Sequence, residues 1–333
     1  MGEKRSNDVL LSSGVERNMY AVNFSDIQSA ASRIEGIIAR TPVVNSPEID
    51  KLAGRTVYMK CENLQHIGAF KFRGATNAVQ LLGQEAEDGI CTHSSGNHGQ
   101  AVALAAKQRG VPSYIVMPEN APRIKVEGVA SHGAEVILCE PNLAARISTA
   151  KSVLDRTGAA FIHPFDNPNV IAGQGTAAME MIEECGSLDA ILSPIGGGGL
   201  MSGTSISTKA MLPSARIFGT EPEGADDAAR SLEAGSFLPQ TGPNTICDGL
   251  LTSMGELTWP IIRDHVDRIV RVPDEEVLEA MTLIYNTFGM VVEPSGAISL
   301  AAVLRKEFKN LTGIKTIGII LCGGNVDPEK LPF

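Results

Sequence analysis

The sequence lacks features that define several classes of protein. Its six cysteines include no Cys-x-x-Cys pair, and a chain of 333 residues can build a core without disulfide bonds. We therefore expect reduced thiols and a cytoplasmic protein. No block of lysine or arginine occurs and the formal net charge is −10, so binding to nucleic acid or to an anionic membrane is not expected. No apolar run approaches the roughly 20 residues that a membrane helix needs.

Apolar residues make up 43% of the chain and charged residues 20%, which is enough for one large or two moderate hydrophobic cores. Short runs rich in β-branched residues alternate with longer runs that have apolar residues at helical spacing. The strand-like runs are 57–60, 90–92, 114–117, 136–139, 160–162, 190–194, 217–221, 269–272 and 316–321.

This alternation predicts an α/β fold with mainly parallel sheets, because parallel strands need crossover connections, which are usually helices. So many strands in one chain indicate two open, twisted sheets flanked by helices. We expect a large domain formed by residues 18–82 and 166–333, with a small domain of residues 83–165 inserted into it. A first helix should follow the capping residues around Asn23 and end near Thr41-Pro42.

Three loops follow predicted strands, at the sheet edge where open α/β folds bind ligands. The loop of residues 93–99 exposes backbone amides at a helix start, which suits a carboxylate or a phosphate, although an ordinary capped helix start is an equally good interpretation. The third loop, Cys322-Gly323-Gly324-Asn325, is by itself no more than a turn.

The second loop contains four consecutive glycines, residues 196–199, followed by Leu200. Glycine is entropically costly, so a ligand should approach the backbone closely there. A phosphate at the start of the next helix is the simplest explanation. Glu221 lies about 20 residues further on, so a dinucleotide-binding dehydrogenase is a minor alternative.

Lys71 stands between Phe70 and Phe72 in a stretch with few charges. Apolar neighbours lower the pKa of a lysine and make its neutral amine available as a Schiff-base nucleophile and as a general base. A lysine that extends its amine into solvent is the commoner case, so the argument depends on Lys71 occurring together with the glycine loop.

Taken together, these motifs resemble, in order and spacing, the fold-type II pyridoxal-phosphate (PLP) enzymes. The likeness is greatest to the branch that contains serine/threonine dehydratases and racemases, and it extends from about residue 27 to residue 327. Further matching motifs are Thr41-Pro42, Lys60-Cys61-Glu62, Gly173-Gln174-Gly175-Thr176, Thr258-Trp259-Pro260 and Val292-Glu293-Pro294.

The resemblance implies a role for each motif in holding PLP. Lys71 would be the lysine that binds the cofactor covalently, and Asn97 would donate a hydrogen bond to its phenolic oxygen. Cys322 occupies the place of the serine that usually meets the pyridine nitrogen, and a neutral group there suits elimination and racemisation better than transamination. The residues implied for the phosphate cradle are Gly196, Gly197, Gly198, Gly199 and Leu200.

The same resemblance implies a substrate loop and a cation site. Ser95 would be the second catalytic residue beside Lys71. The substrate would bind to Arg146 and to the loop residues Ser94, Ser95, Gly96, Asn97 and His98. A site for Mg²⁺ or Ca²⁺ would consist of Glu221, the Ala225 carbonyl and Asp227, since hard cations prefer oxygen ligands; without the resemblance, a solvated acidic helix start would be the better interpretation.

Three residues depart from the pattern of the branch. Ile147 stands where a glutamate is usual, which affects the expected substrate contacts. Phe165 replaces an asparagine near the cofactor. His66 stands where an ATP-binding lysine is expected, which weakens the case for ATP as an activator.

The implied activity is the interconversion of L- and D-serine, together with β-elimination from serine to pyruvate and ammonia. The enzyme would act as a homodimer on a small amino acid. Two alternatives remain open at this point. The chain could be a 3-hydroxyaspartate or threonine dehydratase without racemisation, or a catalytically silent protein that binds PLP or another phosphate.

Overall fold

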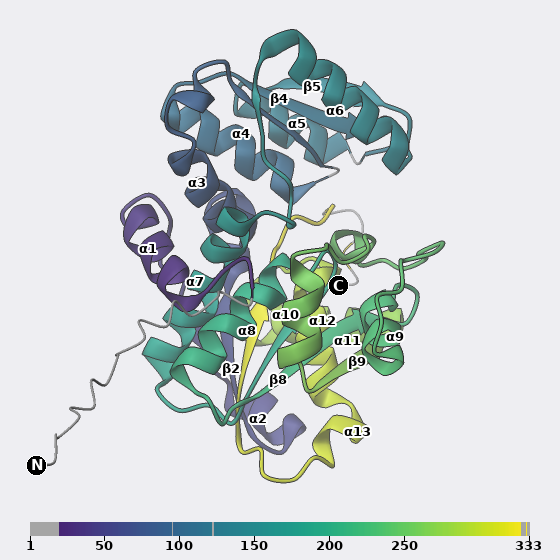
Figure 1. The fold of residues 1–333 in the computed structure, drawn as a ribbon. Coiled ribbons are helices and arrows are strands. Elements are labelled where there is room, and N and C mark those ends of the chain that lie inside the picture. The colour runs from purple at the N-terminus through teal and green to yellow at the C-terminus, as the bar shows by residue number, and fades with distance from the viewer. Residues whose placement is uncertain (1–19, 95, 122, 328–330, 332–333) are drawn as a thin grey trace, which may run out of the picture.

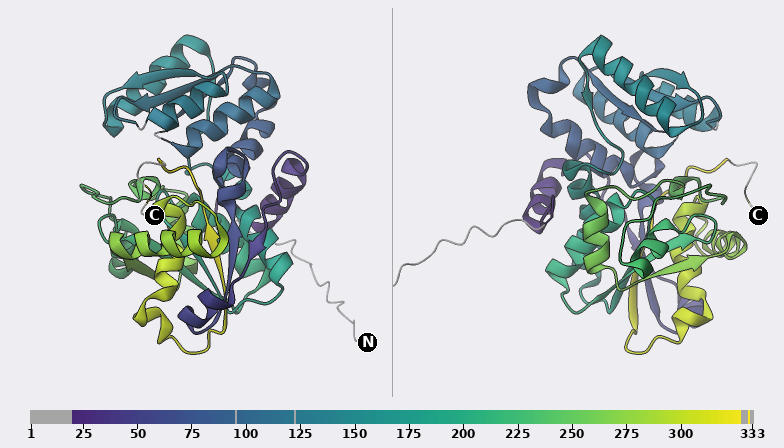
Figure 2. Two further views of the ribbon diagram at one scale, coloured as in Figure 1. Left: turned by 180° about the vertical axis from the view of Figure 1, so that it is seen from behind. Right: turned by 45° about the vertical axis from the view of Figure 1, so that its right-hand side comes forward.

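The computed structural model describes residues 20–94, 96–121, 123–327 and 331. These residues form two lobes, each built on its own sheet (Figure 1), and the lobes remain separate when seen from behind and from the side (Figure 2). The observation confirms the prediction of two mainly parallel sheets flanked by helices. The predicted domain boundaries at residues 82/83 and 165/166 stay a prediction.

The larger sheet has six strands in the order β1-β2-β10-β7-β8-β9. All neighbours are parallel except the pair of β1 and β2. The central strand β10 pairs Ile317 with Val57 on one side and with Ala190 on the other. The bounds are β1 Val43–Val44, β2 Thr56–Cys61, β7 Ala190–Pro194, β8 Arg216–Pro222, β9 Arg268–Val272 and β10 Thr316–Leu321.

The smaller sheet has four parallel strands in the order β5-β4-β3-β6. They are β3 Ile90–His93, β4 Ser113–Pro118, β5 Glu135–Cys139 and β6 Ala160–Phe161. Three helices connect or cover them: α4 Asn97–Arg109, α5 Arg123–Ser131 and α6 Leu143–Thr157.

The remaining helices cover the large sheet or join the two lobes (Figure 1). They are α1 Phe24–Ile34, α2 Pro47–Ala53, α3 Lys71–Leu81, α7 Pro168–Cys185, α8 Gly199–Met211, α9 Asp227–Ala234, α10 Thr258–His265, α11 Asp274–Phe288, α12 Pro294–Leu304 and α13 Lys306–Lys309. Short 3₁₀ turns occur at η1 Glu62–Leu64, η2 His66–Gly68, η3 Gly83–Ala86 and η4 Asp248–Leu250. No helix in these described ranges combines the length and the apolar character needed to cross a bilayer.

One local expectation was wrong, and one short strand was missed. The first helix ends at Ile34 rather than near Thr41-Pro42, because Glu35 leaves the helical conformation with a ψ of 134° and Gly36 follows it with a left-handed φ of 74°. The short strand β1 was not predicted. It forms an antiparallel edge to an otherwise parallel sheet, and two residues are too few to show a period.

Candidate active site

One cavity collects all the residues predicted to hold the cofactor, at the carboxyl ends of β7 and β10. Lys71 opens α3, Asn97 opens α4 and Cys322 directly follows β10, so three separate elements deliver them to one place. This is the position at which open parallel sheets bind ligands. The cavity is lined by Phe70, Lys71, Asn97, Phe165, Pro194, Gly196, Gly197, Gly198, Gly199, Leu200, Gly249, Leu250, Glu293, Ser295 and Cys322.

The Lys71 amine is held inside this cavity. Its Nζ donates a hydrogen bond to the Pro164 carbonyl at 2.9 Å and lies 5.2 Å from the centre of the Phe70 ring. Burial lowers the pKa of Lys71 from its usual 10.5 to about 8, against the opposing charge of Glu293. A substantial fraction of the amine is therefore neutral near physiological pH, as a nucleophile or general base requires.

Only one of the two aromatic neighbours expected for Lys71 contacts it. Phe72 is fully buried and belongs to the core beneath the small sheet, where its ring packs edge-on against His66 with centroids 5.5 Å apart. Adjacent helix residues point about 100° apart, so a side chain following Lys71 cannot share its direction.

The glycine loop presents backbone amides to the cavity. Within the described part of the chain, the amides of residues 196–200 donate to no protein acceptor, and they precede the first turn of α8. Gly198 has a φ of 88°, which favours glycine. Unpaired amides at a helix start form an anion site, so the loop fits a phosphate group.

Phe165 packs directly on this loop. A Cβ added to Gly197 would lie 2.1 Å from Cγ of Phe165, so the ring occupies the space above that glycine. The departure from asparagine at this position therefore changes the wall of the cavity beside the proposed phosphate cradle.

Glu293, which the sequence showed only within a matching motif and without a role, belongs to a side-chain network in the cavity. Its Oε1 accepts a hydrogen bond from Asn97 Nδ2 at 2.7 Å, and Asn97 Oδ1 accepts one from Asn325 Nδ2 at 2.9 Å. Burial raises the pKa of Glu293 to about 7. The available signal was a single carboxylate in the apolar stretch before the helix start at Pro294.

Cys322 offers the cavity a neutral group. The side chain is buried, its thiol donates to the Ser295 carbonyl at 3.2 Å, and burial raises its pKa well above the usual value. An uncharged thiol fits the position expected to meet a pyridine nitrogen.

Of the predicted substrate residues, Asn97 lines the cavity, and Ser94 and His98 lie close to Asn97 in the chain. The Ser94 hydroxyl accepts a hydrogen bond from the Gly96 amide at 3.2 Å, and His98 is buried with Nε2 3.4 Å from the Ile162 carbonyl. Ser95 lies outside the described residues.

Lys125 lies at the edge of the predicted substrate loop, whereas Arg146 lies away from the cavity and its predicted role in substrate binding stays a prediction. Lys125, not predicted, packs against Gly96 and forms an ion pair with Asp248 of the large lobe. Arg146 does not line the Lys71 cavity; it lies on α6, where its charge, after burial and His163, helps to lower the pKa of His93 to about 4. The neighbouring Ile147 is exposed.

The two carboxylates expected to bind a cation, those of Glu221 and Asp227, lie close enough to repel each other. Both Glu221 oxygens accept backbone amides, from Ala228 at 3.1 Å and from Ala229 at 2.8 Å. Asp227 Oδ2 accepts the Met254 amide at 3.2 Å, while its Oδ1 is buried and has no partner among the described residues. An orphaned buried carboxylate oxygen fits an oxygen-ligated cation.

The raised pKa values of these carboxylates also fit a bound cation, which would offset the cost of burying their charge. Burial raises the pKa of Glu221, with a further contribution from Asp227, and raises that of Asp227 to about 6. In the described ranges no group of three His, Cys, Asp or Glu side chains could hold a metal. The site would therefore rest on two carboxylates, the Ala225 carbonyl and water.

Comparison with known proteins gives a consistent picture. The family model "Pyridoxal-phosphate dependent enzyme" matches residues 34–323. A serine racemase of Dictyostelium discoideum is 48% identical over 316 residues, covering 94% of this chain and 98% of that protein. A beta-hydroxyaspartate dehydratase of Paracoccus denitrificans is 43% identical over 316 residues, covering 95% of this chain and 100% of that protein. The solved structure of maize serine racemase superposes with a TM-score of 0.92 at 45% identity, covering 94% of this chain and 96% of that one.

Proposed function

Because this chain belongs to the pyridoxal-phosphate dependent enzymes, we propose that it interconverts L- and D-serine and also eliminates water from serine to give pyruvate and ammonia. The observation that carries the proposal is the meeting, in one cavity, of the Lys71 amine with a glycine loop whose amides are free to bind a phosphate. Relatives at 48% identity named serine racemase support the choice of substrate.

Each residue would have a distinct task. Bound PLP supplies the electron sink that makes the α-proton of an amino acid acidic. Lys71 would remove that proton from one face, while residues 196–200 would hold the phosphate. Asn97 and the neutral Cys322 would contact the ring, and the loop of residues 94–98 would hold the substrate carboxylate. This arrangement also speaks against the dinucleotide-binding and catalytically silent alternatives.

We further propose a bound Mg²⁺ or Ca²⁺ at Glu221, Ala225 and Asp227, a homodimeric assembly and a cytoplasmic location. ATP activation has the least support. His66 stands where a lysine would be expected to bind the nucleotide, and its ring packs on Phe72 instead.

A 3-hydroxyaspartate dehydratase is the second candidate, favoured by the relative from Paracoccus denitrificans. Chiral chromatography and keto-acid analysis with L-serine, D-serine, L-threonine and both 3-hydroxyaspartate diastereomers separate the two. D-serine formed from L-serine supports the racemase. Keto acids formed without any D-amino acid would refute racemisation and leave a dehydratase.

The residue that should divide the two activities is Ser95. Elimination needs one base on one face, a task for Lys71, whereas inversion also needs a proton donor on the opposite face. We expect Ser95→Ala to abolish D-serine formation from L-serine and to retain measurable pyruvate formation. Equal loss of both products would instead assign Ser95 to substrate binding.

A further inference from the structure

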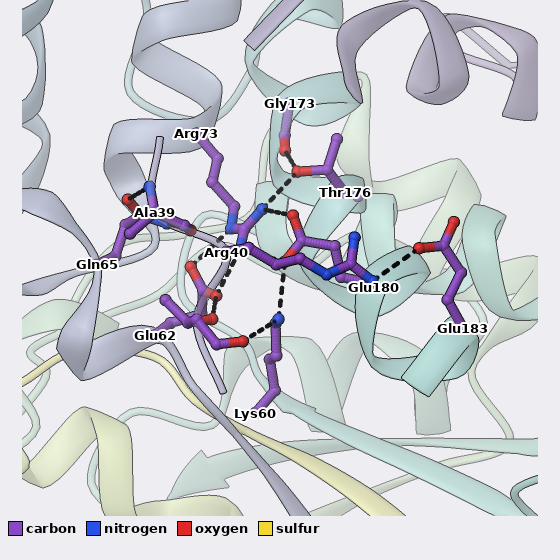
Figure 3. Close-up of polar contacts among 12 residues, drawn as sticks. Ala39, Arg40, Lys60, Glu62, Gln65, Arg73, Gly173, Thr176, Glu180 and Glu183 are labelled. Carbon is purple, nitrogen blue, oxygen red and sulfur yellow. Dashed lines mark hydrogen bonds and ion pairs between the residues drawn. The ribbon is translucent and has the colours of Figure 1, made fainter. Parts of the chain in front are cut away.

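A buried ionic network lies beside the start of α3 (Figure 3). Arg73 is fully buried, and all five of its N–H donors are used. Nε and Nη2 donate to the two Glu62 oxygens at 2.7 and 2.8 Å. Nη1 and Nη2 donate to the two Glu180 oxygens at 2.7 and 2.8 Å. Nη1 also donates to Thr176 Oγ1 at 3.1 Å.

The network joins four segments of the large lobe. Lys60, at 0% side-chain exposure, donates to Glu180 at 2.7 Å and to the Thr41 carbonyl at 2.6 Å. The Thr41 hydroxyl donates to Glu62 at 2.5 Å. The segment at Thr41, strand β2 with η1, helix α3 and helix α7 therefore share one cluster of two cations and two carboxylates.

Stability alone is a poor explanation for such a cluster. Removing two pairs of ions from water costs about as much as their attraction returns, and well-packed apolar residues often do equally well. The planar guanidinium of an arginine donates hydrogen bonds in fixed directions, an arrangement called the fork below. A fork between two carboxylates therefore fixes the orientation of the segments that carry them, which apolar residues cannot do. Here the fork fixes the rotation of α3 relative to β2 and α7.

Helix α3 needs such a constraint because its N-cap residue gives none. Besides the Arg73 side chain, its first turn is tied to α7 through the Gly74 amide, which donates to Gln174 Oε1 at 3.2 Å. Phe70 at the N-cap makes no side-chain capping hydrogen bond. The residues before it include Ile67 with a φ of 60° and Gly68 with a φ of 69°, which are strained or permissive conformations rather than a rigid lead-in. Lys71 is the first residue of this helix, and Arg73 lies two positions further along the same turn.

We propose that Arg73 is a positioning residue that, through the first turn of α3, holds the Lys71 amine against the Pro164 carbonyl. The inference rests on the proposed role of Lys71. It assigns Arg73 no contact with substrate or cofactor. Loss of the fork should let the helix start rotate and bring the amine into contact with water.

The test compares Arg73→Lys, which keeps the charge but loses the fork, with Lys60→Met as a matched control. Lys60 belongs to the same buried network, but its hydrogen bonds go to Thr41 and to Glu180 of α7 rather than to α3. The cofactor-free protein is treated with an amine-acylating reagent across a pH series, and the labelling of Lys71 is followed by peptide mass spectrometry. We expect Arg73→Lys to raise the pH of half-maximal labelling of Lys71, whereas Lys60→Met lowers the Tm but leaves that pH unchanged.

Glu62→Gln serves as a second variant should Arg73→Lys not fold, since it weakens the carboxylate that accepts from Arg73. The same rise in the pH of half-maximal labelling of Lys71 is expected. No rise in either variant, or an equal rise in Lys60→Met, would overturn the inference. In the PLP-loaded enzyme a misplacement of about 1 Å can cost about 100-fold in rate, so kcat should fall while KM changes little. If the loaded protein shows no amino-acid chemistry but the labelling results hold, the proposed function fails and the positioning role stands.

Discussion

At the scale of single residues, the Lys71 amine is governed by two opposing influences. Withdrawal from water lowers its pKa to about 8, and the nearby Cys322 and Glu293 side chains oppose that shift. Glu293 itself has a pKa raised to about 7, mainly by burial. The two groups therefore change charge over adjoining pH ranges, which makes the charge state of the cavity sensitive to pH near neutrality.

The first prediction concerns this pair. In the cofactor-free protein, Lys71 should acylate half-maximally near pH 8, well below the exposed lysines that serve as internal references. Glu293→Gln should lower that pH further, because it removes the charge that favours the protonated amine. Since the folded pKa lies below the unfolded value, the unfolded chain binds more protons between about pH 8 and 10.5, and the Lys71 contribution to stability rises with pH across that range. Titration of Lys71 together with the surface lysines would contradict the prediction.

Residue types indicated Lys71 and the glycines, because their chemistry is local: an amine beside an aromatic ring and free amides. Cys322 received its role only from the family resemblance. No role was predicted for Glu293 or Lys125, because their roles arise from contacts between residues distant in sequence. Asn97 and Glu293 are 196 positions apart, and Lys125 and Asp248 are 123 apart. A period or a motif in the sequence carries no information on such pairs.

At the scale of elements, nearly every strand could be predicted, because parallel strands buried on both faces appear as continuous apolar runs. The same principle placed the glycine loop between β7 and α8. The sequence could not show what packs on that loop. Phe165 was recognised only as a departure, whereas the structure places its ring above Gly197.

This contact gives the second prediction. Gly197→Ala should lower the free energy of unfolding by about 1–3 kcal/mol, the usual cost of overpacking, because the new Cβ meets the Phe165 ring. In a Phe165→Ala background the same substitution should cost clearly less, as a double-mutant cycle in urea can measure. Gly196→Ala is the matched control, since its Cβ would meet the Gly249 carbonyl at 2.9 Å. The cost of this substitution in free energy of unfolding should be the same with and without Phe165→Ala. If the destabilisations by Gly197→Ala and Phe165→Ala simply add in the double mutant, the contact is disproved.

At the scale of the whole molecule, the two lobes meet around the cavity, and each supplies part of the site. Asn97 and the Lys125 ion pair come from the small lobe, and Lys71, the glycine loop, Glu293 and Cys322 from the large one or its junction with α3. Relative placement of the lobes therefore sets the distance between the proposed cofactor site and the substrate loop. The proposed cation site lies apart from this cavity, in the large lobe between β8 and α9, so its effect should appear in global stability.

The last prediction tests that site through ligand linkage. A cation that binds only the folded protein stabilises it by about 2.7 kcal/mol when its concentration is 100 times its Kd. We expect a chelator to lower the Tm of the purified protein and Mg²⁺ or Ca²⁺ to restore it. Glu221→Gln should abolish this response, since the amide keeps an oxygen for the Ala228 or Ala229 amides but loses the charge that attracts a cation.

Asp226→Asn provides the control for that experiment. Asp226 is the acidic neighbour of the proposed ligand Asp227, but it pairs with Arg230 at 2.9 Å and with Arg271 at 2.8 Å. Its substitution should shift the Tm slightly, as expected for partly exposed ion pairs, and leave the chelator response intact. If the chelator changes neither the wild-type Tm nor that of Asp226→Asn, no stabilising cation binds at Glu221 and Asp227. The buried Asp227 oxygen would then need another partner, such as a water molecule or a proton.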